Sequence, residues 1–203
     1  MTYAPERGLV PRGVTCATQD VNIVKIIVVG KNPGNPDDPE ERKRYEVSSE
    51  INGSEAEKAT AMLEATSQWT REAYLAWQDG KRHPYQTHLM RFLRKALNTS
   101  KDEEVLAQVY FTELLKCTDE KDESPNLFDK EHLEKTKKCM KRWLLEELDL
   151  FPQAKVIVAL GHEVEIALMS WKKLPVVYLR HPRAYRKDQY EIALKELGHV
   201  LHS

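Results

Sequence analysis

The fold is decided by the stretch Lys25-Ile26-Ile27-Val28-Val29-Gly30-Lys31-Asn32-Pro33-Gly34. Its first half is a continuous apolar run, which is typical of a strand buried on both faces of a parallel sheet. Its second half is a loop of turn-forming residues, and ligands of open α/β sheets bind at loops that follow the carboxyl ends of strands. Gly30 and Gly34 would let the backbone approach a ligand closely, and Asn32 offers both a hydrogen-bond donor and an acceptor.

Further apolar runs predict more strands, which together cover Ile23–Val29, Gln108–Leu115, Lys155–Leu160 and Pro175–Leu179. Apolar residues at helical spacing predict helices between and after them. The first expected helix covers about 54–80 and begins at the capping box of Ser54 and Glu57. The others are one over Thr87–Leu97, one from Asp129 that ends before Pro152, one through Val164 and Leu168, and a last one that holds Tyr190 and Val200. This order predicts a three-layer α/β/α sandwich with a four-stranded parallel sheet.

The composition fits one globular domain. Of the 203 residues, 41% are hydrophobic and 31% are charged, and the formal net charge is −1. We expect an irregular segment over residues 1–22 and a single domain over 23–203, with a helical insertion at about 54–80. Since no apolar run reaches membrane-spanning length and no secretory signal opens the chain, we expect a monomeric, cytoplasmic protein without a membrane partner.

A second short motif, His181-Pro182-Arg183, also follows an apolar strand directly. The carboxyl ends of parallel strands meet at one edge of a sheet, so we expect Asn32 and His181 to face one pocket. With Arg180, Arg186 and Lys187, the motif forms a basic cluster that suits phosphates. Each feature also has a plain structural alternative: a turn-capping Asn, a structural His and a solvated charged face.

Together these motifs resemble those of the uracil-DNA glycosylase superfamily, over most of the chain from Ile23 onward. Residues 30–34 match the Gly-x-Asn-Pro-Gly first motif of the mismatch-specific and single-strand-selective branches, and residues 181–183 resemble the family's His-Pro-Ser second motif. Phe111–Cys117 looks like the Thr-Asn-Leu-Val-Lys-Cys strand of the iron–sulfur branch, and Arg82–Tyr85 resembles that branch's Arg-Pro-Phe segment.

The resemblance implies a DNA-repair hydrolase that flips a damaged or deaminated base out of the stack and hydrolyses its bond to the sugar. It implies that Asn32 holds the attacking water and that His181 donates to a carbonyl oxygen of the leaving base. Tyr85 would stack on the base, unless it is only a partly buried ring at a helix entrance. The resemblance also implies that the base contacts Gly30, Lys31 and Glu113. It implies that DNA contacts Arg183, Tyr185, Arg186 and Lys187. Tyr185 would fill the space that the flipped base leaves in the stack.

Glu113 departs from the family pattern, which has an asparagine to read the edge of the base. An ionised carboxylate only accepts hydrogen bonds, so it could accept from N3 of uracil but would repel O4. A neutral Glu could accept one bond and donate the other. Glu113 could equally select a base with more donors or abolish excision. In the last case the protein would be a noncatalytic relative that binds nucleic acid or a nucleobase.

The three cysteines, Cys16, Cys117 and Cys139, form no Cys-x-x-Cys pair, and we expect small buried side chains or inert thiols. The iron–sulfur branch uses four cysteines, whereas no second cysteine lies near Cys16. We therefore expect no iron–sulfur cluster and no other cofactor or metal. The alternative is a metal cluster held by Cys16, Cys117 and Cys139, which resemble three of the four cysteines. An unrelated doubly wound domain for a phosphorylated ligand is a third alternative, but the chain lacks a Gly-x-x-x-x-Gly-Lys-Ser/Thr loop.

Overall fold

The computed structural model describes residues 14–15, 20–31, 53–54, 84–115 and 129–202, together with six isolated positions between 57 and 75. In this part of the chain, one sheet has the strand order β1-β3-β2-β4-β5. Its parallel strands are β2 (Ile26–Gly30), β3 (Val109–Glu113), β4 (Val156–Leu160) and β5 (Val176–Leu179). The prediction of a four-stranded parallel sheet is confirmed.

The start of the sheet differs from the expectation in two places. A two-residue strand, β1 (Val14–Thr15), pairs antiparallel with β3 and is too short to carry a periodic pattern. The first parallel strand begins at Ile26 rather than at Ile23, because Val21–Ile23 form a 3-10 turn, η2. The Asp20 carboxylate caps this turn by accepting from the backbone N–H of Asn22 at 2.9 Å. Most of the segment 1–22, which we expected to be irregular, lies outside the described residues.

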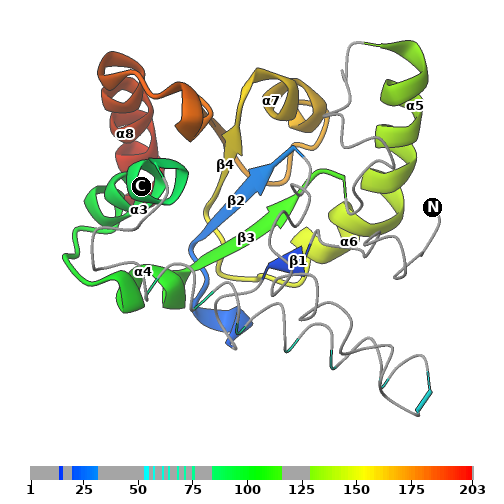
Figure 1. The fold of residues 1–203 in the computed structure, drawn as a ribbon, viewed down its shortest axis with the longest axis horizontal. Coiled ribbons are helices and arrows are strands. Elements are labelled where there is room, and N and C mark those ends of the chain that lie inside the picture. Colours follow the sequence, from blue (N-terminus) through cyan, green and yellow to red (C-terminus); the bar gives the residue numbers. More distant parts are fainter. Residues whose placement is uncertain are drawn as a thin grey trace.

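Helices cover both faces of the sheet (Figure 1). Side chains alternate along a strand, so Ile26 and Val28 face one helical layer while Ile27 and Val29 face the other. The first layer comprises α3 (Pro84–Ala96), α4 (Asp102–Gln108) and α8 (Lys187–His202). The second layer comprises α5 (Lys130–Cys139), η4 (Met140–Leu144), α6 (Leu145–Leu148) and α7 (His162–Leu168). The predicted three-layer sandwich is confirmed.

Several helices depart from their expected bounds. Helix α3 begins at Pro84 rather than at Thr87, since proline is well suited to the first helical position. Helix α4 was not predicted, although the three acidic residues of its first turn, from Asp102 to Glu104, are a recognised start signal. The helix expected after Asp129 contains a π-helical segment, η4, which widens the turn between α5 and α6.

The capping box predicted at residues 54–57 is present. The backbone N–H of Ser54 donates to the Glu57 carboxylate at 2.7 Å, and the N–H of Glu57 donates to the Ser54 hydroxyl at 3.4 Å. These reciprocal bonds satisfy two backbone donors at the start of a helix. Most of the helical insertion expected at about 54–80 lies outside the described residues, so its extent stays a prediction.

Glu147 ties the second helical layer to β3. Its Oε1 atom accepts from the hydroxyls of Tyr110 and Thr112, each at 2.6 Å. Both hydroxyl-bearing residues are almost fully buried, at 4% and 2% exposed. Because Tyr110 and Thr112 point toward the second layer, alternation turns the next residue, Glu113, toward the first layer.

We predict that Glu147→Ala lowers the free energy of unfolding by about 1–3 kcal/mol, because two buried hydroxyls lose a shared acceptor. Urea denaturation of both proteins measures this difference. The control is Glu146→Ala, which removes an exposed carboxylate from the same helix and should change stability by less than about 0.5 kcal/mol. Equal free energies of unfolding for the two variants would contradict a stabilising role of the hydrogen bonds from Tyr110 and Thr112 to Glu147.

Candidate functional site

The predicted site residues that the structure describes gather at the carboxyl edge of the sheet. Gly30 and Glu113 end β2 and β3, and His181 follows the end of β5. The arrowheads of β2 and β3 in Figure 1 point to this edge. Asn32 lies outside the described residues, so its sharing of a pocket with His181 stays a prediction.

Gly30 and Glu113 are paired across β2 and β3 and lie in direct contact. A Cβ atom on Gly30 would lie 2.8 Å from Oε1 of Glu113 and closer still to Oε2. The Glu113 side chain is partly buried, and its Oε2 atom is shielded from solvent. The space above Gly30, which we expected a ligand to use, is therefore occupied by the protein's own carboxylate. This explains why residue 30 has no side chain.

Lys31 points the other way. Its ammonium forms a 2.6 Å ion pair with Glu163 in the first turn of α7, and both side chains are largely buried, at 19% and 25% exposed. Alternation along β2 accounts for this, because Gly30 faces the first layer and Lys31 the second. The side chain predicted to contact the base thus anchors the start of the Asn32 loop to α7.

His181 caps a single 3-10 turn, η5 (Pro182–Ala184), and its orientation is set by that turn. The backbone N–H of Arg183 donates to its Nδ1 atom at 3.3 Å, and the N–H of Ala184 donates to its carbonyl oxygen at 2.8 Å. A neutral ring that accepts at Nδ1 carries its proton on Nε2. Burial, and secondarily the charge of Arg183, lowers the pKa of His181 below its usual value. The half-buried ring is therefore a neutral hydrogen-bond donor at Nε2.

Tyr85 and His181 are brought together from distant parts of the sequence. Tyr85 lies in the first turn of α3, and its ring centroid is 5.5 Å from that of His181, with an angle of 42° between the planes. Tyr85 is partly buried and packs against the core of the first layer. An aromatic face and an N–H donor are thus adjacent at the same edge, as a planar ligand with a carbonyl oxygen requires.

Tyr185, expected to act as a wedge in DNA, is docked on the protein. Its ring stacks on His88 of α3 at a centroid distance of 4.1 Å and an interplanar angle of 6°. Its other contact is an edge-on one with Tyr190 at 4.6 Å. His88 was not predicted as a site residue, although its spacing of three from Tyr85 places both rings on one face of α3.

The basic cluster after His181 is partly neutralised by its own helix. Arg186 pairs with Asp188 at 2.9 Å, and Lys187 lies 3.8 Å from Glu191. Arg183 is exposed and has no ion pair within the described residues. Of the three cations assigned to DNA, Arg183 is therefore the one whose charge stays available to a phosphate.

The cysteine expectation is not tested by the described residues. Cys139 is a partly exposed free thiol at the end of α5, whereas Cys16 and Cys117 lie outside the described part of the chain. Among described residues, no group of three or more potential metal ligands occurs. No helix there is both long enough and apolar enough to span a membrane.

Comparison with family models agrees with the predicted resemblance. The family model described as the uracil DNA glycosylase superfamily matches residues 20–198. A crystal structure titled as wild-type Pedobacter heparinus SMUG2 has a TM-score of 0.46 and 17% sequence identity, covering 89% of this chain and 76% of that chain. No curated protein matches the sequence. The family match spans most of the chain, and the protein belongs to the uracil-DNA glycosylase superfamily.

Proposed function

We propose that this protein is a DNA glycosylase that hydrolyses the bond between a damaged or deaminated base and its sugar. The observation that carries the proposal is the half-buried His181 ring, which accepts from Arg183 N–H at Nδ1 and whose pKa burial lowers, so that the neutral ring has its proton on Nε2. Tyr85 beside it offers a surface on which a flipped base can stack. Membership of the superfamily supports the same chemistry.

In the proposed reaction, a water oxygen bonds to C1′ of the sugar while the bond from C1′ to the base nitrogen breaks. The electron pair of that bond stays on the base and is delocalised onto its carbonyl oxygen. His181 Nε2–H donates a hydrogen bond to this oxygen as its charge grows, and a preformed donor of this kind is a large catalytic contribution. Asn32 is the residue proposed to orient the water, whose proton is released to solvent.

We predict that His181→Ala lowers the rate of base release by about 10²–10³-fold. The assay is single-turnover cleavage of labelled single-stranded and mismatched oligonucleotides that carry a panel of lesion bases. Because the pKa of His181 lies below its usual value, the ring should stay neutral and the wild-type rate constant as the pH falls to about 6.5. At lower pH, protonation of Nδ1 removes the acceptor for Arg183 N–H and loosens the turn that positions the ring, so the rate should drop only there.

His199→Ala serves as the control, because it removes an exposed histidine from the far end of α8. Equal rates for both variants would contradict the role of His181. If neither the wild type nor any variant releases a base from the panel, the noncatalytic alternative is favoured.

Glu113 is the residue proposed to set which base is removed. Its carboxylate lies against Gly30 at the end of β2, on the face of the sheet covered by α3, from which Tyr85 also comes. Ionised, it only accepts hydrogen bonds and favours a base edge with donors over one with two carbonyl groups. An amide of the same shape would accept from N3–H of uracil and donate to O4.

We predict that Glu113→Gln raises uracil release at neutral pH at least severalfold, since a gained buried hydrogen bond is worth about 1–3 kcal/mol. Glutamine keeps the length of the side chain, so its contact with Gly30 is preserved. The measurement is single-turnover uracil release from single-stranded DNA. Strong release by the wild type that Glu113→Gln leaves unchanged would instead assign recognition to the protonated acid, whose two hydrogen bonds the amide reproduces.

Arg183 is the residue proposed to contact a phosphate of the bound strand. We predict that Arg183→Ala flattens the dependence of log Kd on log salt concentration by about one unit, as expected for one lost phosphate contact. Arg186→Ala should have a smaller effect, because Asp188 already pairs with it. Fluorescence anisotropy with a labelled oligonucleotide at several salt concentrations measures each slope.

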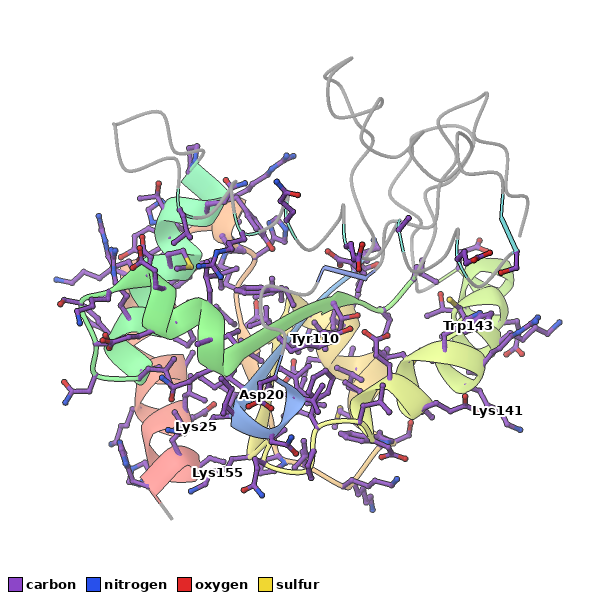
Figure 2. All side chains as sticks on the ribbon, turned by 90° about the horizontal axis from the view of Figure 1, so that it is seen from below. Asp20, Lys25, Tyr110, Lys141, Trp143 and Lys155 are labelled. Atoms are coloured by element: carbon purple, nitrogen blue, oxygen red, sulfur yellow. The ribbon has the colours of Figure 1, made fainter. Side chains whose placement is uncertain are left out.

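Lys141→Ala is the matched control for charge. Lys141 is exposed on η4 in the second helical layer, near Trp143, and Figure 2 shows both residues on the α5–η4 part of the molecule. Removal of this cation changes the net charge equally but should leave the slope unchanged. The same loss of slope in Lys141→Ala and Arg183→Ala would indicate a general effect of charge and contradict the assignment.

A further inference from the structure

Two rows of rings face each other between α3 and the segment that holds His181. Tyr85, His88 and Phe92 lie three and four residues apart on α3, so they share one face of the helix. Opposite them stand His181 at the start of η5, Tyr185 at its end, and Tyr190 in α8. The pairs meet in order, with centroid distances of 5.5 Å, 4.1 Å and 5.6 Å.

We propose that His88 is a positioning residue for His181, acting through its stack with Tyr185. The inference rests on the proposed role of His181, but its test requires neither DNA nor activity. His88 stacks on Tyr185 rather than on His181. Tyr185 and His181 cap the two ends of the same turn, η5.

The ring contacts are the described contacts that join the two caps of the turn to α3. Both bonds that His181 makes with Arg183 and Ala184 are internal to η5, so they shape the turn without attaching it to the helix. Its two cap residues have non-helical backbone, with φ and ψ of −50° and 130° at His181 and −50° and 131° at Tyr185. Pro182 is buried within the turn. The ring contacts of the two caps therefore set how η5 sits on α3.

The His88–Tyr185 pair is the most constrained of these contacts. Its planes are within 6° of parallel, whereas the flanking pairs are tilted by 42° and 80°. Tyr185 is also held from its edge by Tyr190. We infer that these two contacts hold the Tyr185 ring, and through it the end of η5, in place beside His181.

Packing alone does not explain a histidine at position 88, because its ring buries a polar atom. Its Nδ1 atom is buried and has no hydrogen-bond partner within the described residues. Burial, followed by the charge of Arg91, lowers the pKa of His88, which keeps the ring neutral against Tyr185. Because buried polar atoms are nearly always satisfied, an unsatisfied one in the ring that stacks on Tyr185 points to a positional role at some cost in stability.

The test measures the tautomer of His181 by two-dimensional ¹H–¹⁵N NMR of the histidine rings in the full-length protein. The wild type should show a proton on Nε2 of His181 and a pKa below its usual value. In His88→Ala the turn should loosen, the bond from Arg183 N–H should weaken, and both tautomers should appear. His88→Phe keeps a ring for the stack and should restore the wild-type signals.

A second variant reaches the same stack from the other side. Tyr185 is 37% exposed, so Tyr185→Ala should remain folded and should reproduce the effect of His88→Ala on His181. His162→Ala removes an exposed histidine from α7 and should leave the His181 signals unchanged. Wild-type signals of His181 in both folded alanine variants would overturn the proposal, as would failure of the phenylalanine to restore them.

The NMR test of His88 and the activity test of the proposed function can fail independently of each other. If no oligonucleotide releases a base, the NMR signals of His181 still report whether His88 positions it. If the wild type is active, His88→Ala should reduce the single-turnover rate about 10-fold, because small misplacement of a reacting group has effects of this size. Oligonucleotide affinity should stay unchanged, and a loss of affinity with an unchanged rate would contradict positioning.

Discussion

The parallel register between β2 and β3 is the constraint on which the site depends. It sets Gly30 opposite Glu113, and it continues past both strands through bonds from Leu114 N–H to Gly30 O at 2.8 Å and from Leu115 N–H to Lys31 O at 3.0 Å. A slip of one residue would turn Glu113 to the opposite face of the sheet. The carboxylate could not then cover Gly30, and the proposed reader of the base would be lost.

The other half of the site depends on ring contacts rather than on strand pairing. His181 follows β5 at the far side of the sheet from Glu113 in strand order, and its turn is fitted to α3 by Tyr85 and His88. The sheet thus places Gly30 and Glu113, whereas the packing of η5 on α3 places the proposed hydrogen-bond donor, His181. Because different contacts hold the two halves, substitutions can test the proposed recognition of the base and its proposed release separately.

Much of this arrangement could be predicted from the sequence, because apolar runs and their loops report burial and chain direction. The sheet and the shared edge of Gly30, Glu113 and His181 follow from four such runs. What the sequence did not reveal depends on contacts between distant residues. Glu113 covers Gly30 only because the two residues are paired across β2 and β3. Tyr185 packs on His88, which lies far away in the sequence on α3. The strand at Val14–Thr15 is too short to leave a pattern.

We propose above all that a flipped base stacks on Tyr85 and accepts a hydrogen bond from Nε2–H of His181. The sharpest test is a crystal structure of the Glu113→Gln variant, which accepts the edge of uracil, with an oligonucleotide that carries a 2′-fluoro deoxyuridine, whose glycosidic bond resists hydrolysis. We expect the base to stack on Tyr85 with a carbonyl oxygen about 2.7–3.2 Å from Nε2 of His181. A bound strand whose nucleotide lies away from the carboxyl edge of the sheet, or whose carbonyl groups all face away from His181, would contradict it.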